Sequence, residues 1–263
     1  MAKQKRKSAS LSTKLWSKEM VALRRYGWCV CAAMMTLSST ALSGPPFKTD
    51  DPEPVELGHW EAYVASQQQF ALSETDATLP HFEFNYGILP DVQAHIVAPM
   101  GYQRTEDGAR YGFSSTELGV KYRFMEESDE LPQVGVFPLA ELPTGDRRLE
   151  GTEYQLYFPV WLQKSWGHLT TYGGAGYWIN PGTGNRNWTF AGWQVQYDFS
   201  DVLTLGGELT YNSTQVTGAH SDGGCDLGGY VNLDEHNHFL FSLGHNFLGA
   251  GTTFGYLGYQ ITG

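Results

Sequence analysis

The segment F-S-S-T-E-L-G-V-K-Y-R-F, residues 113–124, alternates between two kinds of side chain along its length. Successive side chains of a β-strand point to opposite faces, so this alternation predicts a strand with two different faces. One face ends in two aromatic rings and the other carries three charges: Thr116, Leu118, Val120, Tyr122 and Phe124 against Ser115, Glu117, Gly119, Lys121 and Arg123. A soluble sandwich also alternates in this way, so the rest of the chain decides which solvent the apolar face meets.

Twelve strand-like runs follow residue 57. They span 58–70, 78–89, 92–103, 114–125, 132–142, 152–164, 168–179, 187–199, 202–212, 224–233, 237–247 and 253–261. The connections alternate between short ones, such as 200–201, and long ones, such as 104–113 and 213–223. Outer-membrane barrels have an even number of strands, with short turns facing the periplasm and long loops at the other end. The sequence therefore predicts an all-β fold, a transmembrane antiparallel up-and-down β-barrel of 12 strands over residues 58–263.

The outward faces of these runs are free of charge. The second run, for example, places Phe82, Phe84, Tyr86 and Ile88 on one side. A charged group facing lipid costs about 2–4 kcal/mol at mid-bilayer, so a charge-free face suits a membrane strand. Prolines inside the runs are expected to mark bulges; they are Pro99, Pro138 and Pro159. Glycines of the seventh run are expected to make room for Trp161 and Trp178 inside the barrel; they are Gly173, Gly174 and Gly176.

Residues 1–43 predict a secretory signal peptide that is removed from the mature protein. Two arginines precede an apolar run over about 28–37, and small residues end at Ser43 before Gly44. The apolar run is shorter than the ~20 residues that a membrane span needs, which disfavours the alternative of a retained anchoring helix. Initiation at Met20 rather than Met1 is left open. Cys225 is the only cysteine after this leader, so no internal disulfide is expected.

Residues 44–57 predict an irregular N-terminal arm. The stretch G-P-P-F-K-T-D-D-P-E-P-V-E holds four prolines and has no periodicity. Thr49, Asp50 and Asp51 precede Pro52 and are expected to form a solvated turn, in preference to a cation site. The sequence leaves open whether this arm plugs the lumen.

The polar faces of the runs predict an acidic lumen. Residues 44–263 carry nine basic and 27 acidic side chains, a formal charge of −18, which argues against nucleic-acid binding. Charges of one sign lining a pore set its selectivity, so cations or polar neutral solutes are favoured. In the alternative, Lys121 and Arg123 pair with Glu117 and neighbouring glutamates in a closed network that does not conduct. The predicted pore-lining residues are Glu61, Glu83, His95, Glu117, Lys121, Arg123, Glu141, Glu153 and Glu208.

Catalysis has weaker support in the sequence. His238 and Ser242 share a face of one run, but residues four apart on a strand are roughly 13 Å apart and cannot form a dyad. Asp234, Glu235 and His236 with His238 predict a solvated turn rather than a metal site. No catalytic residue, metal site or cofactor is predicted, and the protein is not expected to be an enzyme.

Several motifs resemble a known family. They are G-P-P-F at 44–47 with T-D-D-P-E-P at 49–54, G-H-W-E at 58–61, N-Y-G at 85–87, E-L-G-V-K-Y-R-F at 117–124, L-P-T-G-D at 142–146 and G-G-E-L at 206–209. Together they resemble the outer-membrane transporters grouped with the meta-pathway of phenol degradation, over essentially all of 44–263. The resemblance implies a porin-like barrel in the outer membrane of a Gram-negative bacterium, with uptake of aromatic or other hydrophobic compounds suspected for some members. Members usually end on an aromatic residue that the barrel-assembly machinery reads; here Tyr259 stands closest to the end.

These observations favour an outer-membrane channel for passive uptake of small solutes, with outer-membrane lipid and the solute as partners. A path that opens sideways into lipid would suit the aromatic excess. Two alternatives from other classes are an outer-membrane lipid-modifying hydrolase and a non-conducting structural barrel.

Overall fold

The computed structural model describes residues 45–149 and 152–263, so the predicted signal peptide and the choice between Met1 and Met20 lie outside the described residues. Within these ranges, no helix is long and apolar enough to cross a membrane. The strands are Trp60–Phe70 (β1), Thr75–Leu89 (β2), Val92–Thr105 (β3), Gly108–Phe113 (β4), Thr116–Met125 (β5), Gln133–Val136 (β6), Leu139–Leu142 (β7), Gln155–Trp166 (β8), Leu169–Ile179 (β9), Trp188–Asp198 (β10), Leu203–Asn212 (β11), Asp222–Asn232 (β12), Asn237–Leu248 (β13) and Thr253–Thr262 (β14).

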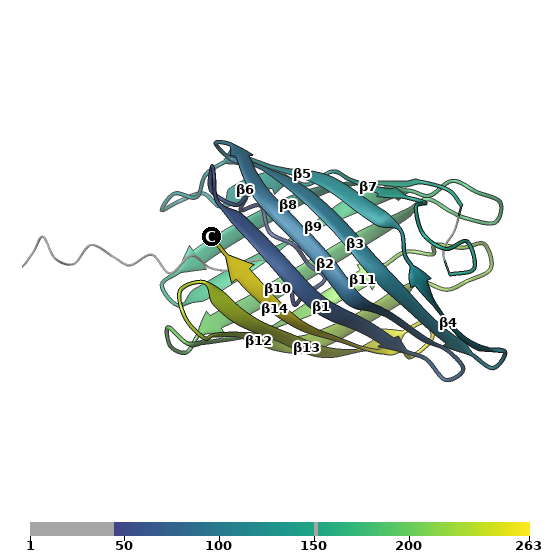
Figure 1. The fold of residues 1–263 in the computed structure, drawn as a ribbon. Coiled ribbons are helices and arrows are strands. Elements are labelled where there is room, and N and C mark those ends of the chain that lie inside the picture. Colours follow the sequence, from purple (N-terminus) through teal and green to yellow (C-terminus); the bar gives the residue numbers. More distant parts are fainter. Residues whose placement is uncertain (1–44, 150–151) are drawn as a thin grey trace, which may run out of the picture. The chain divides into compact units, whose positions relative to one another are not determined.

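The fourteen segments make a closed wall of twelve strands. β4 and β5 both pair with β3 and together form one wall strand; β6 and β7 both pair with β5 and β8 and form another. Every neighbouring pair is antiparallel, and β1 pairs with β14 from Glu61↔Thr262 to Phe70↔Thr253, which closes the barrel. Figure 1 shows the strands tilted across the barrel wall. Closure leaves no free sheet edge, as a sheet in lipid requires.

Prolines stand where the ladder is interrupted. Phe137 and Pro138 separate β6 from β7, and the facing stretch of β8 contains Pro159. Pro99 lies where β3 changes partner from β5 to β4. A proline has no N–H to donate, so these positions cost the wall the fewest hydrogen bonds.

The outer surface is apolar, as the alternation predicts. Phe82, Phe84, Tyr86 and Ile88 are all more than a third exposed. The predicted strand positions are also confirmed to within about three residues, except in one place. Residues 104–113 were expected to form a loop, but most of them form β4, which pairs with the end of β3 from Met100↔Phe113 to Thr105↔Gly108.

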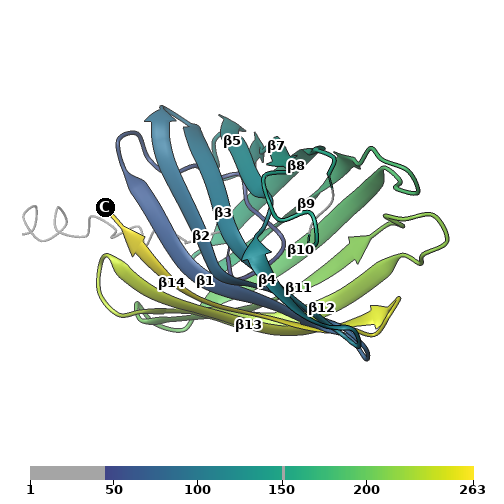
Figure 2. The ribbon, with the colours of Figure 1, turned by 45° about the vertical axis from the view of Figure 1, so that its right-hand side comes forward.

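The arm, residues 45–57, lies inside the barrel. Figure 2 shows it as a purple trace crossing the lumen. Its last residue, Leu57, bridges to Gly87 near the end of β2, and Gly58 donates its backbone N–H to the Gly87 carbonyl at 2.9 Å. From there the chain enters the wall at β1. The arm therefore occupies space that a solute would have to cross.

Candidate functional site

The candidate site is the lumen together with the arm inside it. Glu208, on the inner face of β11, holds the first part of the arm. Its two carboxylate oxygens accept the backbone N–H groups of Lys48 at 2.8 Å and Thr49 at 2.7 Å. Ser242 of β13 donates its hydroxyl to the Pro46 carbonyl at 2.9 Å. Hydrogen bonds to a charged acceptor are roughly twice as strong as neutral ones, so Glu208 is a principal anchor.

Lys121 of β5 holds the middle of the arm. Its ammonium lies 3.0 Å from Asp50 Oδ1 and 3.5 Å from Asp51 Oδ2. Asp51 and Thr49 are fully buried, so the expected solvated turn at these residues is wrong. The alternative in which Lys121 pairs with Glu117 differs from the structure in the partner, because the arm supplies both carboxylates.

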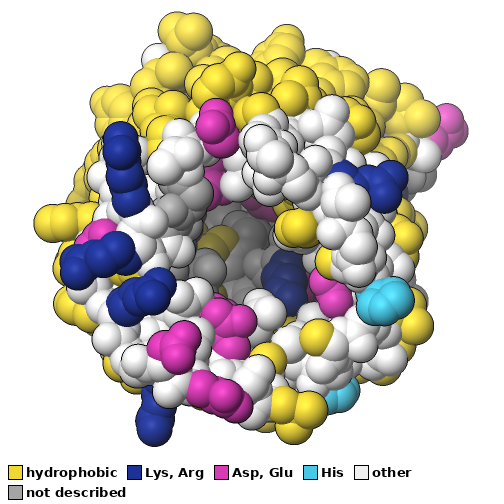
Figure 3. Space-filling view, turned by 90° about the vertical axis from the view of Figure 1, so that its right-hand side faces the viewer, with side chains coloured by type: hydrophobic (Ala, Val, Ile, Leu, Met, Phe, Trp, Pro, Cys, Tyr) yellow, Lys and Arg dark blue, Asp and Glu magenta, His cyan; other side chains and the backbone are white. Residues whose placement is uncertain are grey.

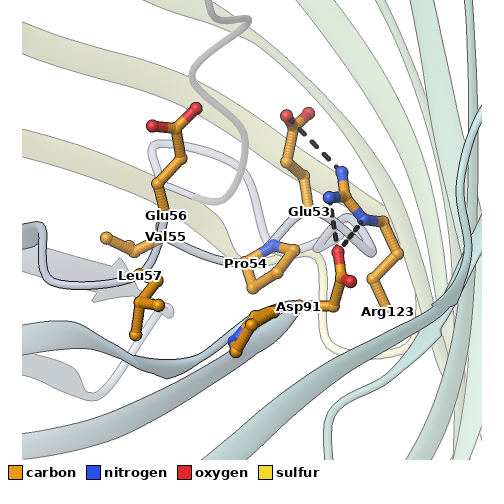
Figure 4. Close-up of a pocket in the computed structure, with 8 residues that line it drawn as sticks. Glu53, Pro54, Val55, Glu56, Leu57, Asp91 and Arg123 are labelled. Carbon is orange, nitrogen blue, oxygen red and sulfur yellow. Dashed lines mark hydrogen bonds and ion pairs between the residues drawn. The ribbon is translucent and has the colours of Figure 1, made fainter.

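Arg123 holds the base of the arm. Its Nε and Nη2 donate to Asp91 Oδ1 at 3.0 and 2.6 Å, and its Nη1 lies 3.9 Å from Glu53 Oε1 (Figure 4). Gln133 and Gln163 donate to the other Glu53 oxygen at 3.2 and 3.3 Å. A cavity of about 460 Å³ lies here, lined by residues 53–57, Pro90, Asp91 and Arg123. Arg123 therefore links the arm to a short turn of the wall, and not to Glu117.

Three glycines of the wall allow the arm to approach closely. A Cβ at Gly87 would lie 2.0 Å from the Glu56 carbonyl oxygen, and one at Gly192 would lie 2.1 Å from Thr49 Oγ1. At Gly135 it would lie 3.0 Å from Pro52 Cβ. Any larger residue at Gly87 would collide with backbone, which cannot turn aside as a side chain can. The wall is thus shaped to the arm at both ends and in the middle.

The electrostatics of the arm depend on pH. Burial raises the pKa of Asp51 to about 8, although Lys121 acts against this shift; Asp50 and Glu53 add to it. One ammonium faces two carboxylates here, so a proton on Asp51 relieves an excess of negative charge. Burial also lowers the pKa of Lys48, opposed by Glu208 and Asp226.

We expect the arm to hold less firmly as the pH rises. The pKa of Asp51 is higher in the docked arm than in a solvated chain, so docking takes up a proton between pH about 4 and about 8 and weakens through this window. The current through planar bilayers at pH 5 and pH 9 measures this: the native chain should conduct severalfold more at pH 9. Asp51→Asn imitates the protonated side chain and should flatten the response; an unchanged pH response in this variant would contradict the assignment.

His95 joins two of the predicted acidic residues. Its Nε2 lies 2.9 Å from Glu117 Oε1 and its Nδ1 lies 2.7 Å from Asn85 Oδ1. Asn85 in turn donates to Glu83 at 2.9 Å. The structure therefore brings Glu83, His95 and Glu117 together beside Lys121.

Glu61 lies next to this group, whereas two other predicted residues lie apart from it. Glu61 faces Asn85 across β1 and β2 and accepts a hydrogen bond from the Tyr63 hydroxyl at 2.8 Å. Glu141, at the opposite end of the lumen, accepts one from Gln155 at 3.4 Å. Glu153 is exposed and precedes β8, so it belongs to the loop rather than to the strand in which it was predicted. The sequence analysis did not identify the arm residues 48–53 as part of the site. The acids in this stretch, Asp50, Asp51 and Glu53, could have been matched with the cations Lys121 and Arg123 of the wall.

Aromatic side chains cover the inner face of the wall near the long loops. The Tyr157 and Trp178 rings stack with centroids 4.6 Å apart, and the Trp178 and Trp188 rings with centroids 5.2 Å apart. Tyr157 lies over Gly176, and Trp161 lies over Gly174, so the expectation that these glycines make room for large inward side chains is confirmed for Trp161. The luminal aromatic cluster consists of Phe137, Tyr157, Trp161, Trp178, Trp188 and Phe190.

The residues of the alternative hydrolase have other partners. Ser242 donates to Pro46, and His238 Nδ1 lies 2.8 Å from Asn232 Oδ1. Among residues 45–149 and 152–263, no group of three or more His, Cys, Asp or Glu side chains is arranged to hold a metal ion. These contacts give no support to a Ser/His dyad.

The long-loop end of the barrel is hollowed. Figure 3 shows this end, with hydrophobic side chains around the outside and charged and polar side chains around the opening. Tyr157, Trp178 and Trp188 stand close to the ends of β8, β9 and β10 on this side. A solute entering from the long loops would meet the aromatic cluster before it reached Lys121 and the arm.

Comparison with known proteins shows which kind of barrel this chain forms. No family model and no curated protein match the sequence. The structure is similar to the COG4313 outer-membrane channel from Pseudomonas putida F1, with a TM-score of 0.63 and 14% identity over 81% of this chain and 98% of that one. The fold is that of an outer-membrane β-barrel. The KdgM porin in complex with disordered oligogalacturonate has a TM-score of 0.53 and 10% identity, over 76% and 98% of the two chains.

The outer-membrane barrel also resembles a protein with a different role. The translocator domain of the autotransporter NalP from Neisseria meningitidis has a TM-score of 0.53 and 11% identity, over 97% of each chain. Identities this low show a shared fold and no shared solute. The shared fold bears out the twelve-strand outer-membrane β-barrel that the sequence predicts, and it is consistent with the Gram-negative outer membrane.

Proposed function

We propose that this outer-membrane barrel is a channel for passive uptake of small solutes, aromatic or hydrophobic compounds among them, and that its own N-terminal arm narrows the path. The observation that carries the proposal is the filling of the lumen. A packed barrel is filled by side chains of its wall, whereas here a separate segment takes the space. Hydrogen bonds from the arm to Glu208 and its ion pairs with Lys121 and Arg123 hold this segment, and they can break while the strands stay paired.

The charge of the lumen supports a preference for cations and neutral solutes. The two luminal cations predicted to line the pore already have acidic partners: Lys121 has Asp50 and Asp51, and Arg123 has Asp91 and Glu53. Glu61, Glu83, Glu117 and Glu141 are additional acids on the same inner faces. An excess of carboxylates in a confined path raises the local cation concentration and repels anions.

The reversal potential of the mature chain, 44–263, tests this proposal in a salt gradient across a planar bilayer. We expect discrete openings with a reversal potential on the cation-selective side. Glu83→Gln with Glu117→Gln removes two carboxylates while keeping the shape and should move the reversal potential toward zero. Glu127→Gln is a matched control, since Glu127 pairs with Lys164 beside a short turn. If a properly folded chain carried no current, the proposal of a channel would be wrong. If the double variant kept the selectivity of the native chain, Glu83 and Glu117 would not line the conducting path.

A further inference from the structure

Three buried or half-buried donors in the luminal aromatic cluster have no partner. The Tyr157 hydroxyl and the indole N–H groups of Trp161 and Trp188 make no hydrogen bond within the described part of the chain. Tyr157 and Trp161 are 5% and 2% exposed. A buried donor without an acceptor costs about 1–3 kcal/mol, so such groups in a packed cluster call for an explanation.

Two of the three donors belong to a set of stacked rings, and the third belongs to Trp161. Tyr157, Trp178 and Trp188 lie almost parallel, with interplanar angles of 12° and 8°. Trp161 meets Phe190 edge to face, with centroids 6.1 Å apart. Flat faces of this kind attract another aromatic ring by offset stacking or edge contact, beyond the burial of its area. The cluster therefore offers aromatic contact and hydrogen-bond donors in one place.

We propose that this cluster is a binding site for a small, uncharged, planar aromatic solute that carries a hydrogen-bond acceptor, such as an ester, ketone or ether oxygen. The ring of the solute lies against the aromatic faces, and its acceptor takes hydrogen from the Tyr157 hydroxyl or from an indole N–H of Trp161 or Trp188. The inference deepens the proposed function and rests on it, because the solute reaches the site through the lumen.

The surrounding charges favour a neutral solute over an aromatic carboxylate. A cation lies beside the cluster: the Lys121 ammonium is 5.1 Å from the centroid of the Phe137 ring. Asp50 and Asp51 already match its charge. Glu141 faces Gln155, two residues before Tyr157 on the same side of β8. An anion here would meet more negative than positive charge, so no favourable electrostatic interaction would offset the free energy it loses on dehydration.

Binding of methyl benzoate to the mature chain in nanodiscs tests the proposal by equilibrium dialysis, with empty nanodiscs as the background. Three comparison compounds each lack one feature: toluene lacks the acceptor, methyl cyclohexanecarboxylate lacks the aromatic ring, and benzoate is charged. One net hydrogen bond corresponds to about 3- to 10-fold in affinity, and we expect methyl benzoate to exceed each of the three by at least this factor.

Three variants locate the site. Tyr157→Phe, Trp161→Phe and Trp188→Phe each remove a donor and retain a ring; at least one should weaken methyl benzoate about 3- to 10-fold and leave toluene unchanged. Tyr177→Phe is the matched control, since Tyr177 faces outward on β9 and is half exposed. Equal affinity for methyl benzoate and toluene, or no change in any of the three variants, would overturn the site. If the protein conducts but does not prefer methyl benzoate over the comparison compounds, the binding site is refuted and the channel stands. If it prefers methyl benzoate but does not conduct, the channel is refuted and the binding site stands.

Discussion

Replacing Lys121 by Met is expected to release the arm from the lumen. The substitution keeps much of the side-chain length but leaves Asp50 and the fully buried Asp51 without their cation. Removing one partner of a buried ion pair costs about 3–5 kcal/mol, because the remaining charge is left uncompensated. The wall does not depend on the arm for its backbone pairing, so the arm can leave and hydrate its carboxylates while the barrel stays closed.

Trypsin measures this release directly. Lys48 lies inside the lumen, where its ammonium is 3.2 Å from the centroid of the Phe254 ring, and the bond to Thr49 is shielded while the arm is docked. We expect cleavage after Lys48, followed by mass spectrometry, to be at least about tenfold faster in Lys121→Met than in the native chain. A tenfold change in rate corresponds to only part of the free energy expected from the loss of the ion pair.

Two controls make this result specific. Lys164→Met removes a lysine that pairs with Glu127 near a short turn, and should leave cleavage after Lys48 unchanged. Adding Asp50→Asn and Asp51→Asn to Lys121→Met removes the stranded charges and should restore much of the protection. Equal protection in the native chain and in Lys121→Met would show that this ion pair does not hold the arm.

The sequence predicts the wall well because alternation of side chains is a local property. A strand that faces lipid on one side and a polar lumen on the other must repeat every two residues, and the segment 113–124 shows this without reference to any partner. β4 escaped prediction because G-A-R-Y-G-F, residues 108–113, is short: Ala109, Tyr111 and Phe113 alternate with two glycines and an arginine over only six residues. Its strand conformation depends on pairing with the end of β3.

The arm could not be placed from the sequence because its contacts are all distant. Its prolines exclude regular structure, and Glu208, which binds the backbone of Lys48 and Thr49, is about 160 residues away along the chain. Opposite charges on the arm and on Lys121 are visible in the sequence, but so are many other acidic partners for that lysine. The pairing is decided by wall glycines such as Gly87 and Gly192, whose small size matters only once the barrel is closed.

Deleting the arm is expected to have the largest effect on conduction. A chain that begins at residue 58 keeps all fourteen strand segments and loses the segment that lies against Gly87, Gly135 and Gly192. A wider and better hydrated path should carry several times more current than the chain 44–263, and it should still prefer cations, because Glu83, Glu117 and Glu208 remain in the wall. The strand signal in circular dichroism must be the same for both chains before their currents are compared.

The most direct measurement is therefore single-channel conductance of chains 44–263 and 58–263, side by side in planar bilayers of the same composition. A severalfold larger conductance for 58–263 would show that the arm occupies the conducting path of the barrel. Equal conductance of two properly folded chains would contradict that position, and with it the arm as the element that narrows the channel.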